Sequence, residues 1–180
     1  MPRTCKNCKK KFEPFYNSVQ LVCSPKCAVE YSKKQEEKKK QKAWKERKQK
    51  LKEGLKTRSD YLKEAQEEFN RYIRTRDKGK PCISCDSTNM KKINAGHYKS
   101  VGGSPELRFN ENNVHVQCEY CNTYLHGNLI EYRKRLIKRI GIDEVEKLEG
   151  PQKPLKLTIP ELILLKEEYK EKIRTLRNNT

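Results

Sequence analysis

The chain has 180 residues, of which 33% are hydrophobic, 42 are Lys or Arg and 24 are Asp or Glu. Globular domains are usually about 45–50% apolar, so the composition excludes one large core and favours small modules that need additional crosslinks. The formal net charge of +18 is more than solubility requires and is typical of a protein that binds a phosphate backbone. A basic, solvated surface without a specific partner is the alternative, and charge alone does not exclude it.

Eight cysteines form four pairs that have the spacing of metal ligands: Cys5/Cys8, Cys23/Cys27, Cys82/Cys85 and Cys118/Cys121. The pairs predict two four-Cys sites, each holding one structural Zn²⁺. Disulfides are the alternative for an even number of cysteines. The start MPRTCKNCKK lacks the apolar segment of a secretory signal, and no apolar run approaches the length of a membrane span. We therefore expect a cytoplasmic protein with reduced thiols and no membrane partner.

Residues 1–31 contain the first four cysteines, and fourteen residues separate Cys8 from Cys23. This spacing predicts a treble-clef or ribbon-like zinc finger. No His or carboxylate has the spacing of a further ligand, so we expect a structural zinc in a finger that also touches DNA through its lysines. The expected apolar filling of the finger is Phe12, Phe15, Tyr16 and Val22.

Residues 32–78 are predicted to form a basic helical arm. Ser32 to Arg58 contains strong helix formers and no proline, and thirteen Lys/Arg against four acids between Lys33 and Arg58 leave a charge of +9. Apolar residues are sparse, so we expect an exposed helix or a fraying linker that either follows DNA or is simply solvated. A second helix, with Ser59 as its N-cap, has an apolar face and ends near Gly79.

Residues 79–141 are predicted to form a hairpin followed by a basic amphipathic helix. The strand candidates are Ala95 to Lys99 and Val114 to Gln117, and Gly141 is expected to end the helix. Residues 142–180 then supply a connector and a final helix, which Thr158 and Glu161 open as a capping box.

Several polar residues would be brought together if the last four cysteines share one zinc ion. The shared ion would make His97, Asn113 and Asn122 neighbours in space. We expect Asn122 near the start of the basic helix and His126 four residues on, with Cβ atoms about 5–6 Å apart on one face. An oxygen and an imidazole so placed can chelate a divalent cation. His97 would remain unligated, as a general base.

The order Cys-x2-Cys, His97, Asn113 and Cys-x2-Cys-Asn resembles the HNH, or ββα-metal, nuclease motif. The wider segments NAGHYKSVGG, FNENNVHVQCEYCN and GNLIEYRKRLIKRIG more closely resemble the phage NinG family, also called Rap, of branch-specific endonucleases that act on Holliday junctions and D-loops. The resemblance covers roughly Gly79 to Gly141, and the N-terminal finger more loosely. It implies an α+β fold of small zinc-stapled modules, with an HNH-like nuclease core at residues 79–141.

The resemblance also implies roles for individual residues. His97 matches the histidine that activates water, Asn113 the asparagine that braces the loop and orients that histidine, and Asn122 a ligand of a catalytic Mg²⁺ or Mn²⁺. Gly96 departs from the pattern, because many HNH nucleases carry a second metal ligand directly before the catalytic histidine. His126 either completes the cation site or the site has fewer ligands than the motif usually provides.

Each of these residues also has a structural interpretation. His97 could be a hydrogen-bonded hairpin histidine, Asn113 could hold a turn through side-chain to backbone bonds, and Asn122 could cap a helix. His115 alternates with Val114 and Val116, and its side chain could face either solvent or the cleft, so we assign it no role.

The expected partner is branched DNA in the bacterial host cytoplasm, bound by a phage-encoded homodimer that works with other recombination proteins. Phosphate contacts suit an enzyme that selects DNA shape, and their candidates are Lys99, Arg108, Arg133 and Lys134. A non-catalytic zinc protein that binds nucleic acid and a sequence-specific HNH endonuclease are the alternatives.

Overall fold

The computed structural model describes residues 2–15 and 19–178, which form two compact units, residues 1–56 and residues 57–180. The boundary between the units divides the predicted 32–78 arm between its two helices, and the segments predicted as 79–141 and 142–180 lie in one unit. Within the described part of the chain, none of the helices has the length and apolar character needed to cross a membrane.

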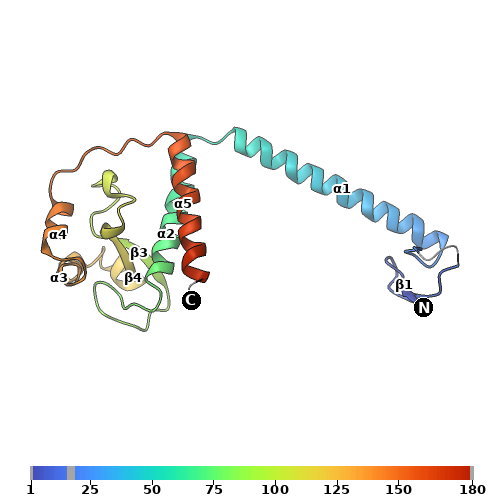
Figure 1. Ribbon diagram of the computed structural model, residues 1–180, viewed down its shortest axis with the longest axis horizontal. Helices are drawn as coiled ribbons and strands as arrows, with labels where there is room; N and C mark the ends of the chain where they lie inside the picture. Colours follow the sequence, from blue (N-terminus) through green and yellow to red (C-terminus); the bar gives the residue numbers. More distant parts are fainter. Residues whose placement is uncertain (1, 16–18, 179–180) are drawn as a thin grey trace. The chain divides into compact units, whose positions relative to one another are not determined.

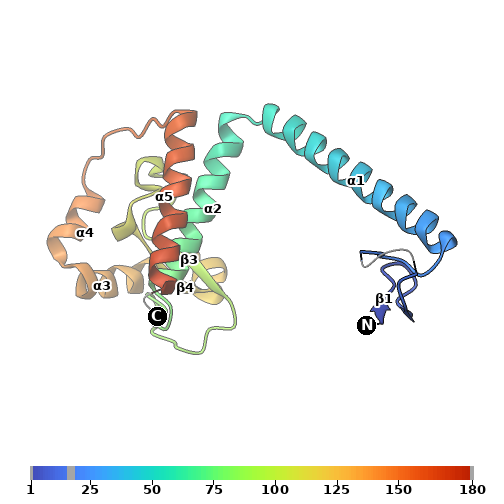
Figure 2. The ribbon, with the colours of Figure 1, turned by 45° about the vertical axis from the view of Figure 1, so that its right-hand side comes forward.

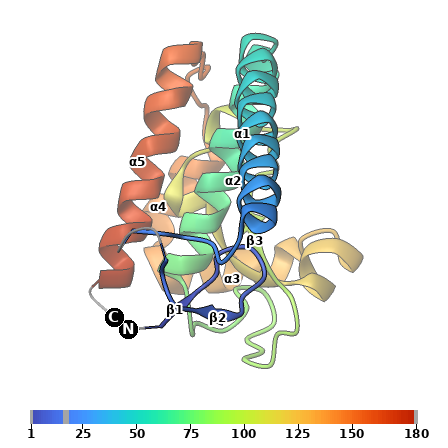
Figure 3. The same ribbon diagram turned by 90° about the vertical axis from the view of Figure 1, so that its right-hand side faces the viewer.

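The first unit consists of a small antiparallel hairpin and one long helix. Strands β1 (Arg3–Thr4) and β2 (Lys11–Phe12) pair, and α1 (Pro25–Gly54) follows. Figure 3 shows this hairpin at the N-terminal end of α1. The helix begins seven residues earlier than predicted, because Ser24 caps it by accepting a hydrogen bond from the Cys27 amide at 3.2 Å, with a proline in the first position.

The first unit has very little apolar interior. Every residue from Glu36 to Leu55 is exposed, which confirms the predicted exposed basic helix. Of the predicted filling of the finger, Phe12 is half-buried but Phe15 is 87% exposed, so the prediction for Phe15 was wrong. Tyr16 lies outside the described residues.

In the second unit, α2 (Arg58–Arg76) and α5 (Ile159–Asn178) lie side by side (Figure 1). Their contact is an apolar cluster that includes Phe69 and Ile73 of α2 and Ile173 of α5. Thr57, rather than the predicted Ser59, is the N-cap of α2. It forms a capping box with the carboxylate three residues later.

A second hairpin, β3 (Ile93–His97) with β4 (Val114–Cys118), packs against this helix pair (Figure 2). The pairing sets His97 opposite Val114 and Gly96 opposite His115. Val114 and Ala95 join the cluster under α2 and α5. The predicted hairpin is confirmed, although β3 lies two residues earlier than expected.

On the opposite face of the hairpin lies α3 (Leu129–Ile140), whose Tyr132 hydroxyl donates to the Gly96 carbonyl, and α4 (Ile142–Glu149) packs against α3. Gly141 ends α3 with a φ of 86°, as predicted. The predicted start of α5 is also confirmed, because the Thr158 amide donates to Glu161 at 2.7 Å. The second apolar cluster, on this face, contains Ile83, Tyr98, Leu107, Tyr132, Leu136, Val145 and Leu148.

Candidate functional site

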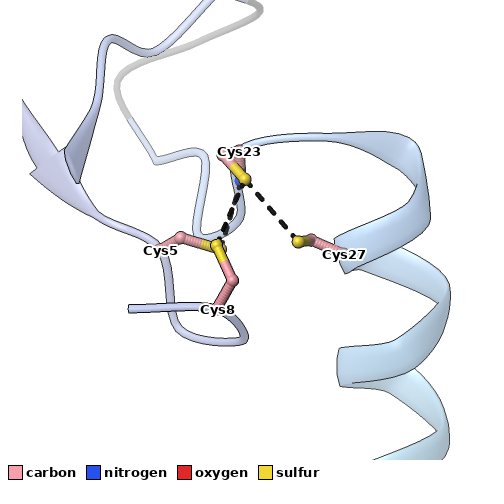
Figure 4. A group of neighbouring side chains, drawn as sticks. All are labelled: Cys5, Cys8, Cys23 and Cys27. Carbon is pink, nitrogen blue, oxygen red and sulfur yellow. Dashed lines mark hydrogen bonds between the residues drawn. The ribbon is translucent and has the colours of Figure 1, made fainter. Parts of the chain in front are cut away.

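The first four-cysteine cluster joins the turn after β1 to the start of α1. Figure 4 shows the Cys23 sulfur between those of Cys8 and Cys27, 3.6 Å from each. All four sulfur atoms, including that of Cys5, lie within 4.8 Å of one another. Four thiolates around a tetrahedral zinc, at Zn–S distances of about 2.3 Å, would be about 3.8 Å apart. The cluster therefore fits one zinc ion.

The second cluster joins the turn before β3 to the end of β4. Its sulfur atoms also lie within 4.8 Å of one another, and those of Cys85 and Cys118 are 3.8 Å apart. Cys82 and Cys121 are buried, and none of the eight cysteines forms a disulfide. Two clusters that could hold structural zinc are thus present, as the pairing of the cysteines predicted.

The first cysteine pair of each cluster lies in the same type of turn. The Cys5 amide donates to the Lys10 carbonyl at 2.9 Å, the Lys9 amide donates to the Cys5 carbonyl at 3.0 Å, and Lys9 has a φ of 64°. In the second cluster, the Cys82 amide donates to the Ser87 carbonyl and the Asp86 amide donates to the Cys82 carbonyl, both at 2.9 Å. Asp86 has the same φ of 64°. Backbone amides also donate to a sulfur in each cluster, which favours thiolates.

His97 lies at the end of β3, half-buried, with its ring centroid 6.4 Å from that of Phe69. Its Nε2 is 3.2 Å from the Arg108 carbonyl oxygen. Because a carbonyl can only accept, we assign the ring proton to Nε2. Burial lowers the pKa of His97 below its ordinary value, against the raising effect of nearby carbonyls. The imidazole is therefore neutral at physiological pH, the form that a general base requires.

Asn113 is fully buried and fastens the loop between the two strands. Its Oδ1 accepts from the Lys99 amide at 2.8 Å, and its Nδ2 donates to the carbonyls of Lys99 at 3.0 Å and Leu107 at 3.2 Å. These bonds fix the backbone two residues beyond His97. The geometry is that of the bracing role, and any role in catalysis stays a prediction.

Gln117 occupies the place where a ligand at position 96 would lie. A Cβ added to Gly96 would be 2.2 Å from the Gln117 Oε1. The Gln117 Nε2 donates to Ser84 Oγ and to the Gly127 carbonyl, each at 2.6 Å, and the buried Oε1 has no partner among the described residues. A side chain at position 96 would therefore require Gln117 or the strands to shift. The alternation of β4 indicated that Gln117 shares a face with His115, but sequence reasoning missed this contact.

Asn122 and His126 do not lie on one face of the basic helix, and that prediction was wrong. Asn122 is in a π-helical turn, Tyr120–Tyr124, and α3 starts only at Leu129. His126 is exposed, has a φ of 46° and lies in the segment between the two elements, outside α3. Among His, Cys, Asp and Glu side chains of residues 2–15 and 19–178, the groups of three or more that could hold a metal are the two cysteine clusters.

The predicted phosphate-binding residues differ in how strongly other side chains hold them. Arg133 forms a two-bond ion pair with Glu149, at 2.7 and 3.0 Å. Arg133 and the Tyr98 hydroxyl lower the pKa of Glu149 to about 2. The structure thus pairs Arg133 with the last residue of α4, a contact that the sequence did not predict.

The other three candidates are held more loosely. Lys134 pairs with Glu131 at 2.7 Å in an exposed contact, which is weak enough to exchange for a phosphate. The Lys99 ammonium lies 5.8 Å from the Tyr98 ring centroid, and Arg108 has a long 3.5 Å bond to Gln66.

A basic hollow of about 780 Å³ lies at the C-terminal ends of α2 and α5. Its charged lining residues are all cationic, which suits an anionic ligand; they are Arg71, Arg74, Arg76, Lys78 and Arg177. Sequence reasoning missed this surface, although the segment RYIRTRDKGK carries most of it.

His115, which the sequence left unassigned, faces the interior. It is 3% exposed, and its Nδ1 is 3.4 Å from the Tyr132 hydroxyl, which donates to the Gly96 carbonyl at 2.9 Å. Burial lowers the pKa of His115 to about 3. It is therefore a neutral core histidine of the β4 and α3 contact.

These features define a small α+β protein with two four-cysteine clusters that could hold zinc. The chain belongs to the NinG family, because the family model described as "Bacteriophage Lambda NinG protein" matches residues 1–179. It is 39% identical over 193 residues to "Protein ninG" of Escherichia phage lambda, with 98% of this chain and 94% of the relative covered. It is also 39% identical to the ninG protein of Salmonella phage P22, with 98% and 95% covered, and 38% identical to that of Escherichia phage 933W, with 98% and 94% covered. No solved structure matches the chain.

Proposed function

We propose that the chain is a structure-selective DNA endonuclease of the HNH type that cuts branched DNA, such as Holliday junctions and D-loops, in phage recombination. The observation that carries the proposal is the position of His97, a neutral, half-buried imidazole at the end of a hairpin strand. Asn113 fastens the adjoining loop, and the second cysteine cluster joins the far end of the hairpin to the following turn.

The finer fold assignments belong to the same proposal. The order of cysteine turn, hairpin, second cysteine pair and helical turn supports an HNH-like, ββα-metal core in the second unit. In the first unit, a cysteine turn on a hairpin and a cysteine pair at the start of a helix support a treble-clef finger.

In the proposed reaction, His97 takes a proton from water, and the resulting hydroxide attacks phosphorus in line with the leaving oxygen. The chain holds the base neutral by burying it and fixes its backbone through Asn113. A divalent cation, Mg²⁺ or Mn²⁺, would stabilise charge on the leaving oxygen. Asn122, in the π-helical turn, and His126, in the segment after it, are its proposed protein ligands, with no shared helix face to support the pair. Such a small ligand set suits an ion that keeps several waters and binds phosphate oxygens.

Neither zinc fits this second role. Four thiolates fill a tetrahedral zinc shell and leave no open position for water or substrate. The cysteine clusters are therefore proposed to act through the positions they give to the hairpin and the helices.

The excess of positive charge supports a DNA partner. Lys99, Arg108 and Lys134 are proposed to hold phosphates, whereas the pairing of Arg133 with Glu149 makes Arg133 the weakest of the four candidates. Two symmetric nicks in a four-way junction would be made most simply by a homodimer, which we propose works in the host cytoplasm with other recombination proteins.

The test is cleavage of a labelled four-way junction and a matched linear duplex, with Mg²⁺ or Mn²⁺, by the wild type and by His97→Ala. A general base contributes about 100- to 10,000-fold to a rate, so His97→Ala should lose at least about 100-fold in nicking while its junction affinity and melting temperature stay close to wild type. Because burial lowers the pKa of His97, the wild-type rate should stay level down to about pH 6.5 and fall only below it.

His126→Ala tests the proposed cation ligand separately from the base, since His126 is an exposed histidine in the same unit. It should bind DNA normally and require more Mg²⁺ for half-maximal rate. Nicking by His97→Ala at the wild-type rate would refute the assignment of the base. If neither DNA is cut with any metal, the chain is a non-catalytic zinc protein, and equal, sequence-dependent cutting of the duplex would indicate a sequence-specific HNH enzyme.

A further inference from the structure

The long helix α1 exposes an aromatic side chain that the zinc finger and the nuclease proposal both leave unexplained. Trp44 is the chain's single tryptophan, and it is 64% exposed in the middle of α1. Tryptophan is usually largely buried. Since every residue from Glu36 to Leu55 is exposed, no apolar layer of the first unit covers the indole.

The surroundings of Trp44 on the helix are cationic. Residues three and four positions away share its face, and these are Lys40, Gln41, Arg47 and Lys48. Lys40 pairs with Glu36 at 2.9 Å, but this pair is exposed and readily exchanged. Arg47 and Lys48 have no ion-pair partner in the part of the chain that the structure describes.

The acidic residues near and beyond Trp44 point the other way. At 100° per residue, Glu46 and Glu53 lie about 200° and 180° around the helix from Trp44. Glu46 is 4.0 Å from Lys42, which is also on that far side. From Trp44 to the C-terminal end of α1, this face therefore holds Arg47, Lys48 and Leu51 without an acid. Glu37 shares the face two turns before Trp44.

A second copy of the chain is a poor occupant of this face. Trp44 and Leu51 are one heptad apart, but the preceding and following heptad positions are Glu37 and Arg58, so the apolar seam does not continue. Between Pro25 and Gly54, twelve Lys/Arg against five Glu leave +7 on each helix. Two such helices would repel each other, whereas a polyanion would be attracted.

We propose that α1 is a DNA-binding arm on which Trp44 stacks against an unpaired base while Lys40, Arg47 and Lys48 hold the flanking phosphates. An exposed aromatic within a cationic surface is how proteins bind single-stranded nucleic acid without reading its sequence. Paired bases in a duplex are stacked on both faces, but branch points and single strands offer a free face. The inference rests on the proposed function for its DNA partner and does not require the chain to cut DNA.

The test uses the full-length, zinc-loaded chain and the emission of its one tryptophan, without Mg²⁺ or Mn²⁺. Titration with a single-stranded oligonucleotide and with a four-way junction should quench the emission, whereas a blunt duplex of equal length should bind, as seen by anisotropy, without comparable quenching. Trp44→Ala should weaken single-strand binding by roughly 5- to 100-fold, the size of one stacking contact, and Trp44→Phe should recover part of it.

Leu51→Ala is the matched control, because Leu51 is 61% exposed on the same face and lacks an aromatic ring. It should bind single strands like the wild type. Alanine favours helix over tryptophan, so the circular dichroism of Trp44→Ala should be unchanged. Arg47→Glu with Lys48→Glu should weaken binding of every DNA and reduce its salt dependence.

Several outcomes would overturn the proposal. They are an emission that stays constant while single strands bind, an equal loss of affinity in Leu51→Ala, and a loss of self-association in Trp44→Ala, which would make the face an interface between copies. The proposed nuclease activity is tested independently of this DNA-binding arm. Quenching by a chain that never nicks DNA would support the DNA-binding arm and refute the nuclease. Nicking of the junction by wild type and Trp44→Ala, with equal affinity for DNA, would support the nuclease and refute the arm.

Discussion

The two cysteine clusters begin with the same turn, yet they hold together units of very different build. Around the first, Cys5 and Cys27 are the buried apolar residues among the described part of unit 1–56. Around the second, Ile83 and Val116 are buried beside the ligands, and Tyr132 is buried between the hairpin and α3. The same cysteine turn thus serves once as the main support of a unit and once as one support among several.

The second unit adds a buried ion network that the first unit lacks among its described residues. Asp77 is 1% exposed and receives hydrogen bonds from Arg76 at 2.8 Å and from Lys80 at 2.8 Å. It also accepts a long 3.4 Å bond from the Val116 amide. Asp77 therefore ties the end of α2 to β4 close to the second cysteine turn, so this unit should keep part of its structure without zinc.

The largest expected effect comes from removing one ligand of each cluster. A structural zinc contributes on the order of 10 kcal/mol to folding. Cys27→Ser should therefore unfold the finger of the first unit completely, because no core replaces the metal. Cys121→Ser should destabilise the second unit strongly but leave α2 and α5 paired through Phe69 and Ile173.

Zinc content, thermal unfolding and hydrogen exchange measure this difference. Each variant should retain one zinc ion in place of two. Hydrogen exchange should show α2 and α5 still protected in Cys121→Ser, whereas residues 2–15 should exchange freely in Cys27→Ser. Complete loss of protection in α2 and α5 would show that the second zinc is as dominant as the first.

A smaller effect is expected from Asp77→Asn, which removes the charge that Arg76 and Lys80 share. Breaking a buried ion pair typically costs about 3–5 kcal/mol, and the partial exposure of Arg76 and Lys80 points to about 3. Asp86→Asn is the control, since the 61% exposed Asp86 pairs with Arg135 at the surface and should cost less than about 1 kcal/mol. Urea unfolding at pH 7 compares the two variants.

The pH dependence of the same variant gives a second readout. Burial opposes ionisation of Asp77, but Arg76 and Lys80 outweigh it and hold its pKa below the usual range. The stability from its ionised form is fully present above the unfolded pKa of about 3.9 and is lost as the pH falls through the lower, folded pKa. Asp77→Asn should therefore reduce the loss of stability at acidic pH. If that loss is unchanged, other carboxylates cause it.

The sequence predicted the elements whose signals are local. The cysteine spacing predicted both clusters, and Gly141 and the Thr158 capping box predicted helix ends, because each depends on residues a few positions apart. The position of α5 against α2 was not predictable, since it depends on packing between Ile73 and Ile173, far apart in the chain.

Within the candidate site, the sequence placed His97 in the hairpin and Asn113 close to it in space. The predicted position of Asn122 and His126 on one helix face was wrong, because no residue pattern in QCEYCNTYLHGN predicts a π-helical turn before Leu129. The sequence also could not show that Gln117 fills the space beside Gly96, because that contact crosses between strands.

Gly96→Ala should have the smallest of these effects on stability, and it tests the packing between β3 and β4. The new Cβ would be 2.2 Å from the Gln117 Oε1 and 2.9 Å from the Gln117 Cβ, so the strands must shift. Overpacking of this kind costs about 1–3 kcal/mol. Gly102→Ala is the control, because a Cβ there meets nothing within 4 Å, and it should change the free energy of unfolding by less than about 0.5 kcal/mol.

The double variant Gly96→Ala with Gln117→Ala distinguishes two explanations for glycine at position 96: a clash with the Gln117 side chain, or a β3 backbone conformation that only glycine adopts. Gln117→Ala alone loses bonds to Ser84 and Gly127 and should be destabilising. If the Gln117 side chain is what excludes a residue at position 96, adding Gly96→Ala to Gln117→Ala should cost less than adding it to the wild type, giving a coupling energy in urea unfolding. Additive costs would mean that the backbone of β3 itself requires glycine, and Gln117 would then not explain why this chain lacks a ligand before His97.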